Sequence, residues 1–467
     1  TGNGDKMESW AADELRHADL GDKRLNKRLI KIVENLAAHP EASVPQASGT
    51  WAETKATYRF WDLKQVKPEA IRRAHTLSTA ERVNACTTVL VVQDTTNLDF
   101  TSHSAVKGLG YLDSVHAKGL KVHSALAVSG LGVPLGLVHQ EVWTRDYKDL
   151  GKKPHGRCRE TKDKESQRWL TALQATQEAL PAEIRVITVA DQEADIYDLM
   201  AAPRRTDHEL LIRGCHDRRV GGEVPYLWDA MHSKAVQGRY TLTLQGKEDS
   251  ETREAVLTVR YGSLEIQPPH HHKRRAQLRP IALNAVLVEE EGAPAEVEPV
   301  RWLLLTTLAV DSLDVAKQVV LWYSYRWLVE RYHYVLKSGC HIEKLQLEAA
   351  DRIQRALATY CIVAWRLLWL TYEARRHPDA PCNQALSDEE WHCLFHATHP
   401  SSTLPEQPPT LREAVRWIAQ LGGFLGRKRD GEPGVKTIWR GLRRLADILI
   451  GWTLAHSQPP QLTPGYG

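Results

Sequence analysis

Two aspartates are placed where they could act on a phosphate or hold a metal ion. Asp94 follows directly on the apolar run 87–93, and Asp191 follows directly on the β-branched run 184–190. Both runs have the pattern of a buried strand, so we expect each strand to end on a carboxylate. If the two strands are neighbours, the carboxylates lie side by side. A carboxylate at a strand end is about as often structural or capping, so each aspartate alone is weak evidence for a site.

A third carboxylate is expected on one long helix, predicted over residues 312–338. At about 100° per residue, Tyr323, Arg326, Glu330 and Lys337 share one face of that helix. A phenol, a guanidinium, a carboxylate and an ammonium together could hold phosphates next to a metal ion. The alternative is a solvated face of salt bridges, since Arg326 and Glu330 form an i,i+4 pair. The many apolar residues of the same helix count against that alternative.

The surrounding elements predict an α/β fold with a mixed sheet. Three strands that follow one another end near Thr144, and helix and strand then alternate as far as Arg213. We expect three parts: a helical domain at 1–75, a mixed α/β domain at 76–350, and a helical domain at 351–467. A β-rich insertion is predicted at about 214–300 within the second of these domains.

Composition narrows the class of protein. The chain has 467 residues, and seven cysteines without tight spacing argue against a disulfide framework. The absence of a long apolar run or a signal peptide leads us to expect a cytoplasmic protein. The net charge is only +3, but basic residues cluster at 23–31, 270–275, 427–429 and 440–444. Any one cluster could be an ordinary solvated face, whereas four fit a ligand such as duplex DNA.

Two further groups of residues have types that could bind a ligand. Arg24, Arg28 and Lys31 lie on a predicted helix that begins after Asp22 and has one apolar stripe, so they could contact DNA phosphates. Residues 382–399 contain two cysteines and three histidines, which could indicate zinc. Their spacing is not that of a standard structural site, and we favour a helix with scattered histidines.

The spacing of Tyr323, Arg326, Glu330 and Lys337 resembles the YREK motif of the insertion-sequence-four family of DDE transposases. Both aspartate strands resemble that family as well, although Gln192 stands where a relative has arginine. The similarity extends from about residue 15 to 455 and fades between 368 and 410. Further segments that carry it are 21–29, 57–60, 138–143, 301–306 and 421–424.

The resemblance implies a ribonuclease-H-like core in which Asp94, Asp191 and Glu330 form the DDE triad and ligate the metal. Two Mg²⁺ ions per site are implied, with Mn²⁺ as a substitute, and carboxylate oxygens suit both ions. The implied reaction is cut-and-paste transposition. The ends are nicked by activated water, a hairpin is formed and opened, and the 3′ ends are joined to target DNA.

The resemblance also implies the DNA contacts and the assembly: residues 1–75 would recognise the transposon end, residues 76–350 would form the catalytic domain, and residues 351–467 would dimerise. Tyr323, Arg326 and Lys337 would hold phosphates beside the scissile bond, Trp302 would stack on a flipped thymine, and Arg213 would lie near the site. A homodimer is implied in the complex with two transposon ends. Two alternatives remain: a regulator that binds ends without cutting them, and a plain ribonuclease-H-like nuclease. The complete triad favours an enzyme over the first, and the flanking helical domains argue against the second.

Overall fold

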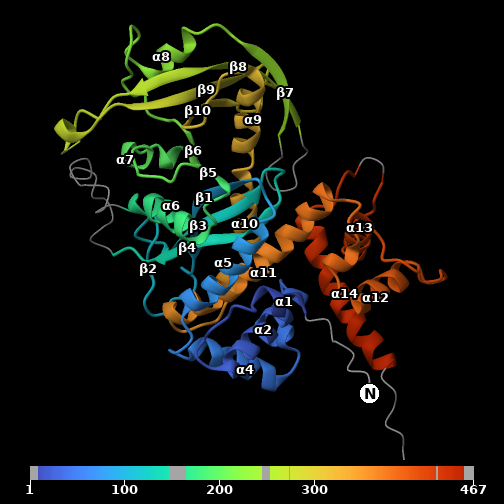
Figure 1. Ribbon diagram of the computed structural model, residues 1–467. Coiled ribbons are helices and arrows are strands. Elements are labelled where there is room, and N and C mark those ends of the chain that lie inside the picture. The colour runs from blue at the N-terminus through green and yellow to red at the C-terminus, as the bar shows by residue number, and fades with distance from the viewer. Residues whose placement is uncertain (1–8, 147–164, 245–252, 273, 428–429, 457–467) are drawn as a thin grey trace, which may run out of the picture. The chain divides into compact units, whose positions relative to one another are not determined.

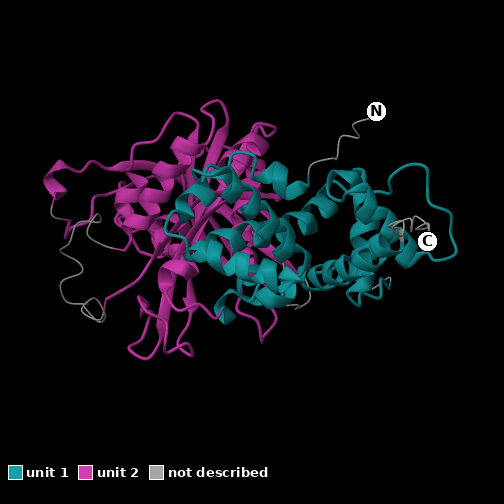
Figure 2. Cartoon of the chain, turned by 90° about the horizontal axis from the view of Figure 1, so that it is seen from below, with its two compact units in different colours: residues 1–74, 334–345, 355–467 teal, residues 75–333, 346–354 magenta. Residues whose placement is uncertain are grey.

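The computed structural model describes residues 9–146, 165–244, 253–272, 274–427 and 430–456. Lys273, Lys428 and Arg429 of the predicted basic clusters lie outside these ranges. The chain divides into two compact units, coloured in Figure 2. The helical unit contains residues 1–74, 334–345 and 355–467, and the sheet unit contains residues 75–333 and 346–354.

The helical unit begins with short helices around an amphipathic one, α2 (Lys23–Ala38). Asp22 caps α2 by accepting the backbone N–H of Arg24 at 2.8 Å, as its place before the helix predicts. The other helices of this unit, with α5 and α11 shared between both units, are α1 (Trp10–Glu14), α3 (Val44–Ser48), α4 (Trp51–Asp62), α5 (Pro68–Val83), α11 (Ala350–Arg376), α12 (Asp388–Thr398), α13 (Leu411–Leu421) and α14 (Val435–His456).

Helices α13 and α14 pack with almost no space between their backbones. A Cβ on Gly441 would lie 1.7 Å from the carbonyl oxygen of Ile418, and a Cβ on Gly422 would lie 2.0 Å from that of Thr437. Only a residue without a side chain permits this approach. Gly423, at φ +96°, provides the turn that follows α13.

The sheet unit is built on one mixed sheet (Figure 1) with the order β2-β3-β1-β5-β6-β10-β9-β8-β7, in which β4 also pairs with β3. The predicted mixed sheet is confirmed. Its strands are β1 (Thr88–Asp99), β2 (Gly110–Tyr111), β3 (Lys118–Ser129), β4 (Pro134–Trp143), β5 (Arg185–Ala190), β6 (His208–Arg213), β7 (Gly238–Leu244), β8 (Arg253–Ile266), β9 (Ile281–Glu291) and β10 (Arg301–Thr306).

The segment predicted as a β-rich insertion contributes β7, β8 and β9 and the short helix α8 (Leu227–His232). These strands extend the main sheet beyond β10, because β9 pairs with β10 from Arg301↔Glu289 to Thr306↔Asn284. Apolar side chains of β8, β9 and β10 share one buried cluster with residues of β5 and β6. The segment is thus continuous with the sheet that carries the aspartates.

Strand register places the two aspartates next to each other. β1 and β5 pair in parallel from Thr88↔Arg185 to Gln93↔Ala190, so Asp94 and Asp191 are the next residues of adjacent strands. The expectation that the first strand ends on Asp94 is wrong. β1 continues to Asp99 because its pairing with β3 runs on from Asp94↔Ser124 to Asp99↔Gly119.

Helices cover both faces of this part of the sheet. Side chains alternate along a strand, so Asp94 and Ser124 point to one face and Thr95 and His123 to the other. On the first face, α10 (Trp327–Tyr334) places the imidazole of His333 3.2 Å from the Ser124 hydroxyl. On the second face, α6 (Gln167–Ala179) packs Trp169 edge-on against His123. The aspartates therefore face α10.

The single long helix predicted over residues 312–338 is wrong. The chain forms α9 (Leu313–Ser324), then α10, then a π-helical segment, η6 (Val335–Gly339). The backbone N–H groups of Tyr325 and Arg326 donate to carbonyls three residues back, at 3.1 and 2.9 Å, and this tighter turn interrupts the α-helix. The uniform rotation used to place Tyr323 with Glu330 therefore does not apply across residues 325–326. Within the described residues, every helix is too short or too polar to cross a bilayer.

Candidate active site

The Asp191 carboxylate is oriented by the turn that follows β5. Asp191 is the N-cap of a 3₁₀ turn, η4 (Gln192–Ala194), and accepts the backbone N–H of Glu193 at 2.9 Å. On the adjacent strand, the backbone N–H of Thr95 hydrogen-bonds to the Asp94 carboxylate. Each aspartate is thus oriented by the backbone of a residue just after it.

Glu330 of α10 joins the two aspartates, and we call Asp94, Asp191 and Glu330 the carboxylate cluster. The pKa of Asp94 is raised to about 7, chiefly by burial; the Arg326 guanidinium lowers this pKa, and the negative charges of Asp191 and Glu330 raise it. Burial likewise raises the pKa of Asp191, to which Glu330 also contributes. Such interactions act over several ångströms, so the structure places the three predicted carboxylates in one electrostatic neighbourhood. Their oxygens are not all within 4.8 Å of one another, since among the described residues only Asp195, Cys215 and His216 meet that limit.

The guanidinium of Arg326 provides the positive charge within this cluster. It is hydrogen-bonded to the Glu330 carboxylate. Burial by itself would lower the pKa of Arg326, but Tyr323, Glu330 and Asp94 together raise it. The tighter turn at residues 325–326 does not separate Arg326 from Glu330, because Arg326 directly precedes α10, which contains Glu330.

Tyr323, Arg213 and Trp302 adjoin the cluster. The phenol of Tyr323 is buried, which raises its pKa, and it is hydrogen-bonded to Arg213. Arg213 stands at the end of β6 and also donates to the carbonyl of Arg301 at 3.3 Å. The indole of Trp302 packs edge-on against the Tyr323 ring, with centroids 5.0 Å apart. The structure therefore unites these predicted residues beside Asp191.

His333 is a member of this site that sequence reasoning missed. Its Nδ1 lies 3.7 Å from Oδ2 of Asp94, and its Nε2 lies 3.2 Å from the hydroxyl of Ser124. Gln140 donates to the same hydroxyl at 3.3 Å. His333 follows Glu330 by three residues, so both face one side of α10. That spacing could have found it.

The remaining predicted DNA contacts belong to the helical unit. Lys337, in η6, lies 3.7 Å from Glu343. Arg24 pairs with Asp22 at 2.9 Å, Arg28 pairs with Glu53, and Lys31 lies 3.9 Å from Glu34. The Arg24 side chain is 91% exposed, and exposed ion pairs are weak, so a phosphate can displace its carboxylate partner.

The carboxylate cluster has the chemistry of a divalent-metal site. Its donors are hard oxygens, which Mg²⁺ and Mn²⁺ prefer. Burial, and to a lesser extent the neighbouring negative charges, disfavours the ionised forms of Asp94 and Asp191 and so raises their pKa values, and a bound cation would offset that cost. Asp94, Asp191 and Glu330 are therefore the residues that would hold the metal.

Two other groups of residues have side chains that could bind a metal, but their contacts in the structure are of another kind. Asp195, Cys215 and His216 lie close enough to share a metal ion, but buried Asp195 already pairs with Arg218 at 2.6 Å and accepts two backbone N–H groups. In residues 382–399, for which zinc is the less favoured interpretation, Cys382 and Cys393 belong to an apolar core, and His396 and His399 stack on aromatic rings.

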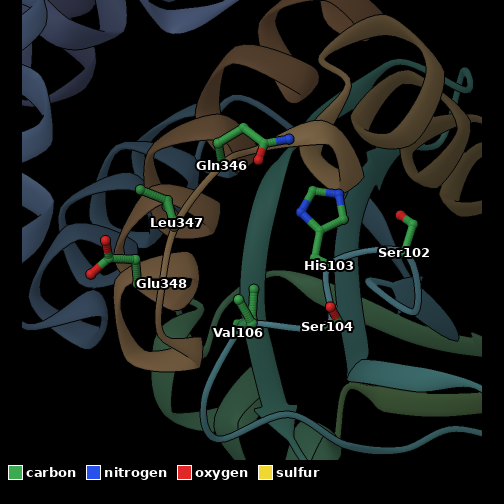
Figure 3. A pocket seen from close by; sticks show the side chains of 8 residues that line it. Ser102, His103, Ser104, Val106, Gln346, Leu347 and Glu348 are labelled. Atoms are coloured by element: carbon green, nitrogen blue, oxygen red, sulfur yellow. The ribbon is translucent and has the colours of Figure 1, made fainter.

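A cavity of about 550 Å³ is lined by the loop after β1 and by residues 346–348 (Figure 3). Its side chains include Ser102, His103, Gln346 and Glu348. The carboxylate cluster does not contribute to the lining, so this cavity is separate from the site described above.

Comparison with known protein families agrees with this geometry. Residues 79–366 match the transposase DDE domain, residues 7–66 match the transposase DNA-binding family, and residues 362–459 match the transposase Tn5 dimerisation domain. The first match alone covers more than half of the chain, and it confirms the predicted ribonuclease-H-like fold. The three matches confirm the resemblance to DDE transposases and support DNA and a second copy of the chain as partners. The chain therefore belongs to the family of DDE transposases, DNA-binding enzymes that depend on a divalent metal.

Proposed function

We propose that the protein carries out cut-and-paste transposition with Mg²⁺ as its metal, and that Asp94, Asp191 and Glu330 are the catalytic carboxylates. The observation that supports this best is their convergence: two strand positions in register and one helix position share a single electrostatic cluster. Two Mg²⁺ ions bound there would activate the attacking oxygen and stabilise the leaving oxygen of a phosphodiester displacement.

The protein's own groups supply charge and orientation. Asp94 and Asp191 must both be ionised to hold a cation, and their backbone hydrogen bonds orient them for it. Once a cation neutralises Glu330, the Arg326 guanidinium is available to a phosphate, which it can bind through two parallel hydrogen bonds. Arg213 and the phenol of Tyr323 are placed to donate to a neighbouring phosphate oxygen. Lys337 would add a further cation.

Trp302 is proposed to hold a base removed from the duplex during formation of a hairpin on the transposon end. Its ring is partly exposed and is braced by Tyr323, so one face can stack on a base. Base stacking on an aromatic side chain contributes about 1–3 kcal/mol, enough to favour an unstacked nucleotide. The 3′ ends released after the hairpin opens would then be joined to target DNA.

The proposed reaction is tested with purified protein and a duplex that carries the terminal repeats of its element. With Mg²⁺ or Mn²⁺ we expect a nick, then a hairpin that migrates as double-length DNA in a denaturing gel, and then a blunt end. With EDTA or Ca²⁺ in place of Mg²⁺, we expect end binding without cleavage. Binding without cleavage in Mg²⁺ would instead support the alternative of a regulator that does not cut.

Recognition of the ends is proposed to involve Arg24, Arg28 and Lys31 of α2. Replacing Arg24 and Arg28 with alanine should weaken end binding and reduce the slope of log K against log salt by about one unit for each phosphate that the protein no longer neutralises. Arg24 should contribute more, since Arg28 must first leave Glu53. The matched control is Lys317→Ala, which removes a cation that pairs with Asp314 in the sheet unit. An unchanged slope would show that these arginines only face solvent.

A further inference from the structure

The buried side of the sheet, opposite the carboxylate cluster, holds an arginine that the proposed chemistry does not use. Arg168 lies in the first turn of α6, and its side chain is only 12% exposed. Its Nε donates to the hydroxyl of Thr95 at 2.8 Å, and its Nη2 donates to the carboxylate of Glu193 at 2.8 Å. One planar guanidinium thus connects β1 to the turn after β5.

The two residues that Arg168 binds are the two that orient the aspartates. The backbone N–H of Thr95 hydrogen-bonds to Asp94, and the backbone N–H of Glu193 hydrogen-bonds to Asp191. The side chains of Thr95 and Glu193 therefore bind Arg168, while their backbone N–H groups bind the carboxylates of Asp94 and Asp191, respectively.

This link lies where the sheet stops holding the two segments together. The parallel pairing of β1 with β5 ends at Gln93 and Ala190, one residue before each aspartate. Beyond that point, two carboxylates that repel each other must be kept at a fixed separation. A rigid guanidinium with two hydrogen bonds at fixed angles meets that requirement better than a flexible ammonium would.

The position of Arg168 is itself restrained from several sides. Its Nη1 donates to the carbonyl of Glu165 at 3.0 Å, and its guanidinium carbon lies 5.3 Å and 5.9 Å from the ring centroids of Trp169 and Trp143. The Thr95 hydroxyl also hydrogen-bonds to His123 at 2.9 Å. Arg168 is therefore fixed firmly against Thr95, whereas its bond to Glu193 reaches solvent, because that carboxylate is 60% exposed.

We propose that Arg168 is a positioning residue that sets the spacing of Asp94 and Asp191 for the metal, by holding Thr95 and Glu193 from the opposite face of the sheet. This inference rests on the proposed metal site. It assigns Arg168 no contact with DNA or metal, and its effect passes through the two backbone N–H groups.

The test measures Mn²⁺ binding to the full chain by calorimetry, without DNA. Arg168→Met, which keeps an unbranched side chain that can pack like the aliphatic part of arginine but removes the guanidinium and its donors, should weaken Mn²⁺ binding by about 10- to 100-fold, the range for residues that orient metal ligands. Arg168→Lys should fall between, because an ammonium lacks the planar fork. Excess Mn²⁺ should restore cleavage by Arg168→Met but not by Asp94→Asn.

The matched control is Arg260→Met. Arg260 is similarly buried and pairs with Glu289 at 3.0 Å, but it contacts neither aspartate segment and shares no partner with Arg168. Its loss should leave Mn²⁺ affinity within about twofold of the parent, even if the unfolding temperature falls. Glu193→Gln should weaken Mn²⁺ binding as well, and the double variant with Arg168→Met should bind no more weakly than Arg168→Met alone.

Each contrary outcome has a distinct meaning. If Arg168→Met binds Mn²⁺ like the parent but unfolds at a lower temperature, Arg168 only packs the fold, and the inference is overturned while the metal site stands. If Asp94→Asn also binds Mn²⁺ like the parent, the carboxylate cluster is not the metal site, and both proposals fail.

Discussion

Glu330→Ala is expected to bind transposon ends as tightly as the parent protein and to cut them at least about 1,000-fold more slowly. The large loss follows because the variant lacks a metal ligand and also leaves Arg326 without its carboxylate partner. Removing a single preorganised donor from a reacting centre slows catalysis by about 100- to 1,000-fold. A metal ligand affects every such interaction that the metal makes. Gel shift measures binding, and single-turnover cleavage in Mg²⁺ measures the rate.

The control for Glu330→Ala is Asp314→Asn, which removes an exposed carboxylate from the neighbouring helix α9 and should cut normally. Glu330→Gln preserves the volume of the side chain and should be as slow as Glu330→Ala. Normal cleavage by either Glu330 variant would rule out the assignment of Glu330.

The Glu330→Ala variant also tests which subunit of the dimer cuts each transposon end. If each subunit recognises one end and cuts the other, a dimer of Glu330→Ala with a subunit defective in end recognition should still cut one end. Cleavage by wild-type protein that stays monomeric on DNA would contradict this arrangement.

Asp94→Asn is expected to make the metal-free protein more stable at pH 8, although it abolishes cleavage. Burial raises the pKa of Asp94 from 3.8 to about 7, so between these values the folded state binds more protons than the unfolded state. The free energy of unfolding therefore falls as pH rises from about 4 to about 7. One pKa unit corresponds to about 1.4 kcal/mol. Since the side chain is 19% exposed, we expect a gain of about 1–3 kcal/mol for the variant at pH 8.

Urea unfolding in EDTA at pH 5 and pH 8 measures this effect. The advantage of Asp94→Asn should be larger at pH 8 than at pH 5, where the folded wild-type carboxyl is mostly protonated. Adding Mn²⁺ at pH 8 should stabilise the wild type by mass action and should have little effect on the variant. A wild-type protein whose stability rises between pH 5 and pH 8, relative to the variant, would show that the Asp94 carboxylate is stabilised and not strained.

Much of the site could be predicted because its chemistry follows local rules. An apolar β-branched run followed by aspartate predicts a carboxylate at the end of parallel pairing, and β5 with Asp191 satisfies this. The cap at Asp22 and the bounds of α4 follow equally local signals. The YREK motif groups Tyr323 with Glu330 even though helical periodicity cannot do so across the break at residues 325–326. A motif is matched by its spacing in the sequence, and this match does not require an unbroken helix.

The features that sequence patterns miss depend on contacts distant in sequence. Strand β1 passes Asp94 because β3 continues to pair with it, and the place of β9 beside β10 in the main sheet depends on a pairing that the apolar run 281–288 does not itself specify. In the sequence, nothing distinguishes Arg168 from the other polar residues of an amphipathic helix. Its partners lie 73 and 25 residues away, and only the folded sheet brings them together.

The close approach of α13 and α14 has a consequence for how relatives of this protein can diverge. Gly422 has φ −80° and Gly441 lies within a helix, so neither position needs glycine for its backbone conformation. Both need it because a single methyl group would meet a carbonyl oxygen of the facing helix. Substitution of either glycine by a larger residue is therefore disfavoured as long as the two helices keep this spacing. Glycines that persist there among homologues would record helix packing and not a role in catalysis.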